Sequence, residues 1–137
     1  DIRNPENTRA LQQEILARKT ALESAQEPAE ITFMDRGIPD SLAYFRQAGL
    51  DTAPVETATQ KFRYRAVFLF DRLPLKADSV RTETDAAAQQ LEDMFLADYQ
   101  RLGYDVIRVP VMPIMSRADF ILTQLGLPAL SSKAGLA

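Results

Sequence analysis

The chain has 137 residues, the length of one domain, and its 46% apolar and 26% charged residues are the balance of a globular protein. It holds no Cys and no His, which excludes disulfides, Cys/His zinc sites and a Ser-His-Asp triad. The net charge is -3 and the basic residues are dispersed, so nucleic acid is not an expected partner. No apolar run approaches the roughly 20 residues that span a bilayer, and no signal peptide is visible, so we expect a cytoplasmic protein without a membrane partner.

The first expected helix begins at Asn4 and Pro5, a pair that suits a helix N-cap and first position. Its apolar residues recur at helical spacing, which predicts one stripe facing the core: Leu11, Ile15, Leu22 and Ala25. The charged side chains of this segment are expected on a solvated face: Arg3, Arg9, Glu14, Arg18, Lys19 and Glu23. The alternative for Arg18 is a place in a phosphate site.

Three short runs favour β-strands, at residues 31–34, 66–70 and 106–109. Helices are expected between and after them, over 39–49, over 54–63, from a Thr82/Asp85 capping box to Gly103, and from Ser116 to Gly126. The polar segment 71–82 is expected to be a loop. Strands that alternate with helices predict an α/β fold with parallel pairing, and the apolar first two strands are expected to be covered by helices on both faces.

Two of the expected strands end in an Asp-Arg pair, Asp35-Arg36 and Asp71-Arg72, and the third ends at Pro110. In open parallel sheets, ligands bind outside the carboxyl ends of the strands. Carboxylates hold Mg²⁺ and guanidinium groups hold phosphoryl oxygens, so two such pairs at one edge favour phosphate chemistry. The alternative is that each Asp caps a turn and each Arg is a surface charge, and for Asp71-Arg72 we favour that alternative.

The run Lys61-Phe62-Arg63-Tyr64-Arg65 interleaves cations and aromatic rings. This pattern occurs in RNA-binding surfaces. We favour a structural interpretation instead, in which the end of a helix leads into a buried strand.

The stretch from Phe33 to Asp40, followed by Leu42, Tyr44 and Phe45, resembles the FDRGxPD stretch of a family of predicted ATPases. That family belongs to the AAA-type P-loop kinase-like proteins and includes the ribosylnicotinamide kinase domain of the bacterial NAD regulator. The similarity runs from about residue 6 to residue 125. It implies a three-layer, parallel-sheet P-loop kinase-like α/β fold over residues 1–126, followed by a flexible tail over 127–137.

The resemblance also implies a function, namely nucleotide binding and phosphoryl transfer by a small-molecule kinase or an ATPase. The implied cofactor is Mg²⁺ with ATP or GTP, and the implied partner is a small-molecule acceptor. Asp35 would face Mg²⁺, or the acceptor hydroxyl as a general base, and Arg36 would face the acceptor or the transferring phosphoryl group. Asp40 and Tyr44 would line the acceptor pocket.

The nucleotide contacts implied by the resemblance lie later in the chain. Residues 72–83 would form a lid over the phosphates, with Arg72 and Arg81 as nucleotide-binding arginines and Arg81 also counted as catalytic. Pro113 would lie near the nucleotide base.

The P-loop pattern GxxxxGK[ST] does not occur in these 137 residues, since none of the five glycines precedes a Lys. In the family, that loop follows a strand that lies between the strands matching 31–35 and 65–70. Three explanations stay open. The chain, which opens with Asp1 and not Met, is the later part of a longer domain; or the strands close up into a remnant without a nucleotide site; or a partner chain supplies the strand. The alternative function is a non-catalytic, degenerate nucleotide-binding-like or regulatory interaction domain.

Overall fold

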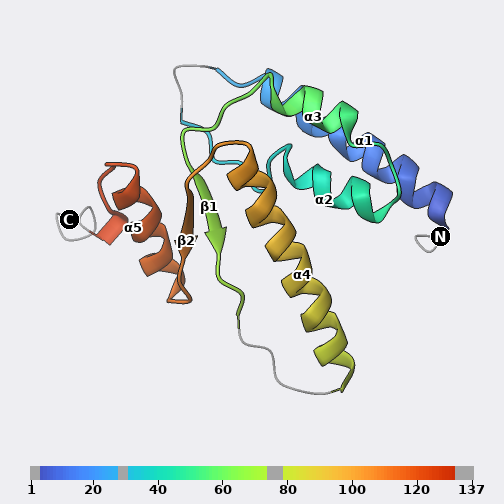
Figure 1. The fold of residues 1–137 in the computed structure, drawn as a ribbon. Coiled ribbons are helices and arrows are strands. Elements are labelled where there is room, and N and C mark those ends of the chain that lie inside the picture. The colour runs from blue at the N-terminus through green and yellow to red at the C-terminus, as the bar shows by residue number, and fades with distance from the viewer. Residues whose placement is uncertain (1–3, 28–30, 74–78, 132–137) are drawn as a thin grey trace. The chain divides into compact units, whose positions relative to one another are not determined.

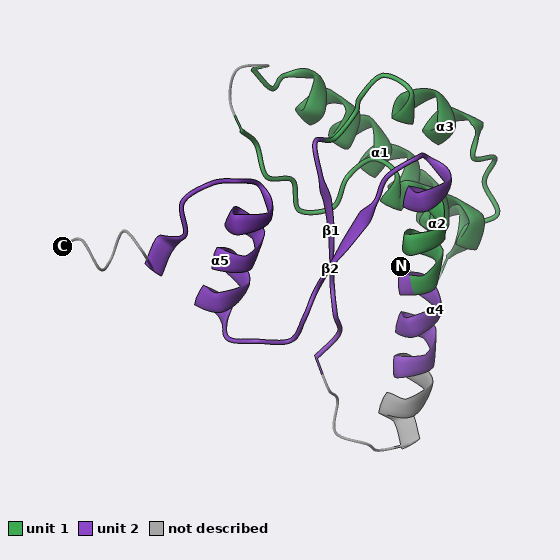
Figure 2. Cartoon of the chain, turned by 60° about the vertical axis from the view of Figure 1, so that its left-hand side comes forward, with its two compact units in different colours: residues 1–64, 93–98 green, residues 65–92, 99–137 purple. Residues whose placement is uncertain are grey.

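The computed structural model describes residues 4–27, 31–73 and 79–131, with the side chains of 79–84 left aside. The chain divides into two compact units, which Figure 2 distinguishes: unit 1 is residues 1–64 with 93–98, and unit 2 is residues 65–92 with 99–137. In chain order (Figure 1) the elements are α1 (Pro5–Ser24), α2 (Asp40–Gln47), α3 (Ala53–Thr59), β1 (Val67–Phe70), α4 (Ser79–Arg101), β2 (Val106–Val109) and α5 (Ile114–Gln124).

Helix α1 begins where the sequence predicts, because the side chain of Asn4 accepts a hydrogen bond from the backbone N–H of Glu6 at 2.9 Å. Its buried face differs from the expected one. Leu11 and Leu22 are 46% and 54% exposed, whereas Leu16 and Glu23 are buried. The apolar stripe predicted from spacing alone is therefore wrong, since the packed face combines Leu16 with polar side chains that bond to the backbone of the following loop.

Residues 31–34 were expected to form the first strand, and this prediction is wrong. The segment is extended, but it pairs with no strand in the part of the chain that is described. Ile31 and Phe33 are 52% and 59% exposed. A β-prone sequence becomes a strand only where a neighbour satisfies its backbone N–H and C=O groups, and the segment instead leads directly into the turn at Asp35 and Arg36.

The apolar core of unit 1 lies around α2. Ile38, Leu42, Phe45 and Val55 are fully or almost fully buried. Helix α2 ends as predicted before Gly49, whose φ of 71° is readily adopted only by glycine. Helix α3 begins one residue before the expected segment 54–63 and ends earlier, at Thr59.

A bidentate ion pair joins α2 to the part of α4 that belongs to unit 1. Both guanidinium nitrogens of Arg46 donate to the carboxylate of Asp98, at 2.8 and 2.7 Å. Asp98 is buried, and the pair raises the pKa of Arg46. Because both oxygens of Asp98 are satisfied, this contact fixes the end of α2 without leaving an unpaired buried charge.

Unit 2 contains the sheet, and its parallel pairing confirms the predicted α/β class. Strands β1 and β2 align from Val67 opposite Val106 to Phe70 opposite Val109, and α4 lies between them in the sequence. The expected cover on both faces of β1 is not present among the described residues, because its first three side chains are half-buried and Phe70 is 46% exposed.

Two helices of unit 2 begin earlier than predicted. Helix α4 begins at Ser79, so residues 79–82 are helical and the Thr82/Asp85 capping box is wrong; no Gly or Pro between Ser79 and Gly103 interrupts the helix. Helix α5 begins at Ile114 and not at Ser116.

Within α5, the carboxylate of Asp119 accepts hydrogen bonds from the backbone N–H of Leu130 and Ser131, at 2.7 and 3.4 Å. A side-chain hydrogen bond from Ser131, together with these backbone contacts, lowers the pKa of Asp119. The boundary between a domain at 1–126 and a tail at 127–137 stays a prediction, and residues 132–137 lie outside the described ranges. Among the helices that are described, none combines the length and the apolar character needed to cross a bilayer. The cytoplasmic location stays a prediction.

Candidate functional site

The structure brings together three residues that the sequence assigned to an acceptor site: Arg36, Asp40 and Tyr44. Nη1 of Arg36 donates a hydrogen bond to the hydroxyl of Tyr44 at 2.9 Å and lies 3.7 Å from a carboxylate oxygen of Asp40. The guanidinium carbon also lies 5.6 Å from the ring centre of Phe95, which packs against Tyr44. The side chain of Arg36 is 52% exposed and that of Asp40 only 10%. The cluster therefore presents a positioned cation to solvent.

The backbone of Arg36 has an unusual conformation. Its φ is 66°, in the left-handed region that residues with a Cβ rarely adopt. Such a conformation costs about 1 kcal/mol or more and persists only where surrounding contacts hold it. The contacts that hold the residues directly after Arg36 therefore help to maintain the conformation of the site.

The peptide unit between Gly37 and Ile38 is held at both ends by side chains. Nζ of Lys19 donates to the carbonyl oxygen of Gly37 at 3.2 Å. The N–H of Ile38 donates to the hydroxyl of Tyr64 at 3.1 Å and to the carboxylate of Glu23 at 3.3 Å. The hydroxyl of Tyr64 in turn donates to the other oxygen of Glu23 at 2.6 Å.

Sequence reasoning missed these three polar residues. Lys19 and Glu23 were assigned to a solvated face, which is wrong for both, although it holds for Arg18, which pairs with Glu14 on the exposed side of α1. The sequence pattern predicts only that Tyr64 lies where the end of a helix leads into a strand. The signal that could have found the first two is their spacing of four residues, which places them on the same face as Leu16.

Burial shifts the ionisation of both charged residues on α1. Desolvation lowers the pKa of Lys19, and the nearby Asp40 carboxylate partly opposes that shift. Desolvation raises the pKa of Glu23, while the hydrogen bonds from Tyr64 and from the N–H of Ile38 favour its charged form. The two groups are therefore held by specific partners that offset part of their desolvation.

The second Asp-Arg pair is occupied by ion pairs within unit 2. Arg72 binds the carboxylate of Asp85 and also donates to its backbone oxygen at 3.2 Å. Nε of Arg108 donates to Asp71 at 2.9 Å, and its Nη2 lies 2.8 Å from the buried carboxylate of Glu92, an ion pair without hydrogen-bond alignment. Both side chains of Asp71-Arg72 therefore have ion-pair partners, which differs in detail from the turn cap and surface charge of the alternative.

Comparison with known proteins gives a family match. A model described as an AAA domain matches residues 1–117 of the chain. The chain belongs to the AAA domain family. No curated protein and no solved structure gave a match. Membership of the AAA family indicates nucleotide binding of the ATPase type.

The other site residues expected from the sequence are Asp35, Pro113 and Arg81. Asp35 is exposed, and no hydrogen bond or ion pair joins its carboxylate to another residue in the described ranges. Pro113 directly precedes α5. The side chain of Arg81 lies outside the described residues, as does the lid segment 74–78. The roles of Asp35, Pro113, Arg81 and the lid segment stay predictions.

In the part of the chain whose side chains are described, acidic residues could hold a metal ion together with a phosphate-containing ligand. No group of three or more Asp or Glu side chains that could hold a metal occurs where side chains are described. One carboxylate is sufficient for Mg²⁺ when phosphate oxygens and water complete the octahedron. Asp35, exposed and next to Arg36, fits that limited role.

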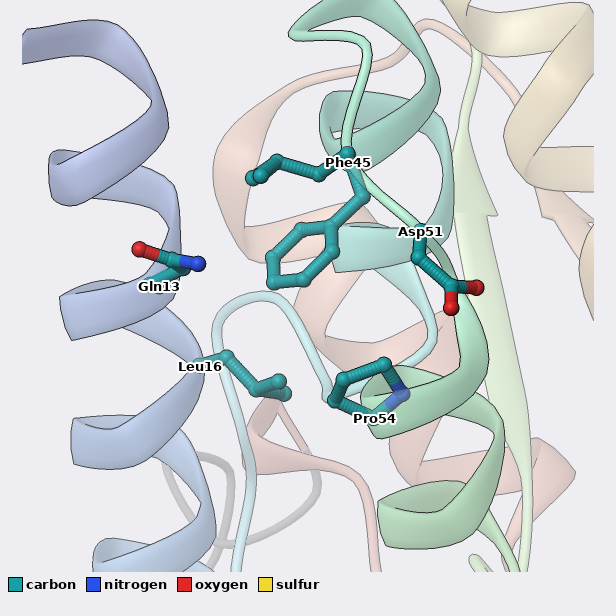
Figure 3. Close-up of a pocket in the computed structure, with 6 residues that line it drawn as sticks. Gln13, Leu16, Phe45, Asp51 and Pro54 are labelled. Carbon is teal, nitrogen blue, oxygen red and sulfur yellow. The ribbon is translucent and has the colours of Figure 1, made fainter. Parts of the chain in front are cut away.

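Unit 1 of the AAA domain also has an open cavity of about 350 Å³, lined by Gln13, Leu16, Phe45, Leu50, Asp51 and Pro54. Figure 3 shows Leu16 on α1 pointing toward Phe45 and Pro54. The lining is mostly apolar, and its one carboxylate, Asp51, accepts a hydrogen bond from the N–H of Ala53 at the start of α3. None of the residues of the Arg36 cluster lines this cavity.

Proposed function

We propose that this AAA domain binds ATP or GTP with Mg²⁺ and transfers the terminal phosphoryl group to a small acceptor, at a site that contains Asp35 and Arg36. The observation that carries the proposal is the grouping of Arg36 with Asp40 and Tyr44, inside the region that matches the AAA family.

Arg36 suits a phosphoryl contact because most of its donors have no partner among the described residues. A guanidinium carries five N–H donors in a planar fork. The hydroxyl of Tyr44 takes one of them, and the carboxylate of Asp40 is a loose partner at 3.7 Å. A phosphoryl oxygen approaching the exposed side would gain charge-assisted hydrogen bonds to a cation that is already oriented.

In the proposed reaction, the oxygen of the acceptor hydroxyl bonds to the terminal phosphorus as the bond from phosphorus to the nucleoside diphosphate oxygen breaks. Asp35 accepts the hydroxyl proton, or else it holds the metal ion. Bound Mg²⁺ would supply positive charge at the phosphate oxygens. Arg36 stabilises the charge of the transferring group, and Asp40 and Tyr44 bind the acceptor.

The nucleotide itself would be held by residues later in the chain than Asp35 and Arg36. Arg81 and Arg72 are proposed to contact the phosphates from the lid at 72–83, and Pro113 to lie near the base. The support for Arg72 is weaker than for Arg36, because Asp85 already occupies its guanidinium.

The finer fold that we propose is the three-layer P-loop kinase-like sheet. Two observations support it: the extended segment 31–34 has exposed apolar side chains and no strand partner among the described residues, and β1 is only half-buried. A strand paired with each would satisfy their backbone groups. An upstream segment or a partner chain would supply that strand.

One observation favours a second candidate, a non-catalytic nucleotide-binding-like or regulatory domain. The phosphate-binding pattern GxxxxGK[ST] does not occur in the 137 residues. Without its backbone amides and Lys, the β- and γ-phosphates lack their usual cradle.

The test is binding and turnover of Mg-ATP and Mg-GTP by the full-length protein, measured by calorimetry and by release of nucleoside diphosphate. We expect binding that is weakened by Arg36→Ala, and turnover that is lost in Asp35→Asn. Binding without turnover in the unaltered protein would favour the second candidate in its nucleotide-binding-like form. Binding of neither nucleotide would overturn the proposed phosphoryl transfer and would favour the regulatory form of the second candidate.

A further inference from the structure

We infer that Lys19, Glu23 and Tyr64 form a clamp on the Gly37–Ile38 peptide that positions Arg36 for its ligand. The inference rests on the proposed function, since it assigns these three residues to the site that contains Arg36. They are positioning residues, because their hydrogen bonds to the Gly37–Ile38 peptide act on Arg36 through the backbone.

The clamp grips a single peptide plane from both sides. The carbonyl of Gly37 and the N–H of Ile38 belong to one rigid unit. Lys19 binds its oxygen, while Glu23 and Tyr64 share its N–H. Lys19 and Glu23 are one helical turn apart on α1, so the helix sets the spacing of the two grips.

Fixing this plane restrains the residue before it. Gly37 has the widest backbone freedom of any residue type and would otherwise let the chain rotate directly after Arg36. With the plane fixed, Arg36 stays at a φ of 66°, and its guanidinium stays within 2.9 Å of the Tyr44 hydroxyl. If the clamp is released, we expect the backbone of Arg36 to relax to negative φ and the side chain to leave Tyr44.

The composition of the clamp argues against a role in stability alone. Replacing buried ionic groups by well-packed apolar residues is often neutral or stabilising, so a buried Glu is a poor choice for stability. The same helix exposes Leu11 and Leu22 while it buries Glu23. Lys19 and Glu23 therefore lie where a loop peptide offers α1 both a hydrogen-bond acceptor, the carbonyl of Gly37, and a donor, the N–H of Ile38.

The first experiment tests whether the clamp holds the loop, and it needs no ligand. Tyr64→Phe removes one hydroxyl and keeps the ring. We expect hydrogen exchange at the Ile38 amide to accelerate at least about tenfold relative to the Val55 amide in the same unit. Asp98→Asn, which weakens the ion pair with Arg46, is the matched control and should change the two amides alike. An unchanged ratio in Tyr64→Phe would overturn the clamp.

The second experiment tests whether the clamp acts through Arg36. In the full-length protein we expect Tyr64→Phe to weaken Mg-ATP binding by about tenfold, and to have no further effect when Arg36 is already Ala. Asp98→Asn should lower the melting temperature and leave the affinity unchanged. Glu23→Gln, which keeps an acceptor for Ile38, should retain more affinity than Glu23→Ala.

The outcomes separate the clamp from the proposed function. Independent, additive effects of Tyr64→Phe and Arg36→Ala would overturn the positioning role. Absence of Mg-ATP binding in the unaltered protein would overturn the proposed function, and the exchange ratio at Ile38 would still decide whether the loop is clamped.

Discussion

The chain contains the same Asp-Arg dipeptide twice, and the two copies have different surroundings. In unit 1, Arg36 has a phenol hydroxyl at 2.9 Å and an aromatic ring at 5.6 Å, with its nearest carboxylate at 3.7 Å. In unit 2, Arg72 binds the Asp85 carboxylate directly, and Asp71 is occupied by Arg108.

This difference shows that the partners of an Asp-Arg pair decide whether its arginine is available to bind an anionic ligand. An arginine held by a neutral hydroxyl and a ring keeps its charge available to an anionic ligand. An arginine paired with carboxylates has that charge neutralised, and a ligand would have to displace them. Of the two pairs, Asp35-Arg36 therefore suits a binding site better than Asp71-Arg72 does.

The largest expected effect is on phosphoryl-transfer activity, and it tests the difference between the two Asp-Arg pairs. In the full-length protein, we expect Arg36→Ala to reduce phosphoryl transfer by on the order of 10³-fold, because the reaction depends mainly on positioned charge. Arg72→Ala should reduce it by less than about tenfold, since Asp85 already neutralises that side chain. The measurement is kcat/KM for Mg-ATP turnover; equal losses in the two variants would remove the distinction between the pairs.

The next effect concerns stability, and here we expect the variant in unit 2 to lose more unfolding free energy than the variant in unit 1. Arg108→Gln leaves Glu92, which is buried at 7% exposure, without its cation, and we expect a loss of about 2 kcal/mol in the free energy of unfolding. Arg36→Gln removes a half-exposed cation and should change that free energy by less than about 1 kcal/mol. Urea denaturation of both variants provides the measurement, and a larger loss in Arg36→Gln would contradict the assignment.

What the sequence could predict followed from local signals. Asn4 and Pro5 marked the start of α1, and Gly49 marked the end of α2. The apolar runs at 66–70 and 106–109 became a parallel pair. The grouping of Arg36 with Asp40 and Tyr44 on α2 was expected only through the resemblance.

What the sequence could not predict depended on partners distant in the chain. Residues 31–34 have strand-like composition, but a strand also requires a hydrogen-bonded neighbour. The buried face of α1 was misassigned because the partner of Glu23 is a backbone N–H in a loop, which no hydrophobic pattern reveals. Tyr64 lies 41 positions from Glu23, so that contact had no local signal.

A third prediction compares the two units through their glycines. Gly49 in unit 1 and Gly126 in unit 2 have φ values of 71° and 72°, and an added Cβ would meet nothing within 4 Å at either position. Alanine at each should therefore cost about 1 kcal/mol from backbone conformation alone, as Arg36 already does at its φ of 66°. Thermal unfolding measures both. A clearly unequal loss would show that the two units do not contribute equally to the cooperative transition.

The smallest effect is the pH dependence of stability that Glu23 introduces. Burial raises the pKa of Glu23 in the folded protein above its usual value of 4.5. The folded state then holds this proton more tightly than the unfolded state, so the stability that Glu23 contributes is present below pH 4.5 and is lost as the pH rises through its folded-state pKa.

Glu23→Gln cannot ionise and lacks this loss. We therefore expect the unfolding free energy of the unaltered protein to fall relative to that of Glu23→Gln as the pH rises above 4.5, as measured by urea denaturation. Glu14→Gln, on the exposed side of the same helix, controls for the removal of one charge. A difference between the unaltered protein and Glu23→Gln that stays constant with pH would mean that the carboxylate is fully compensated by Tyr64 and the Ile38 amide, and that its burial costs the fold nothing.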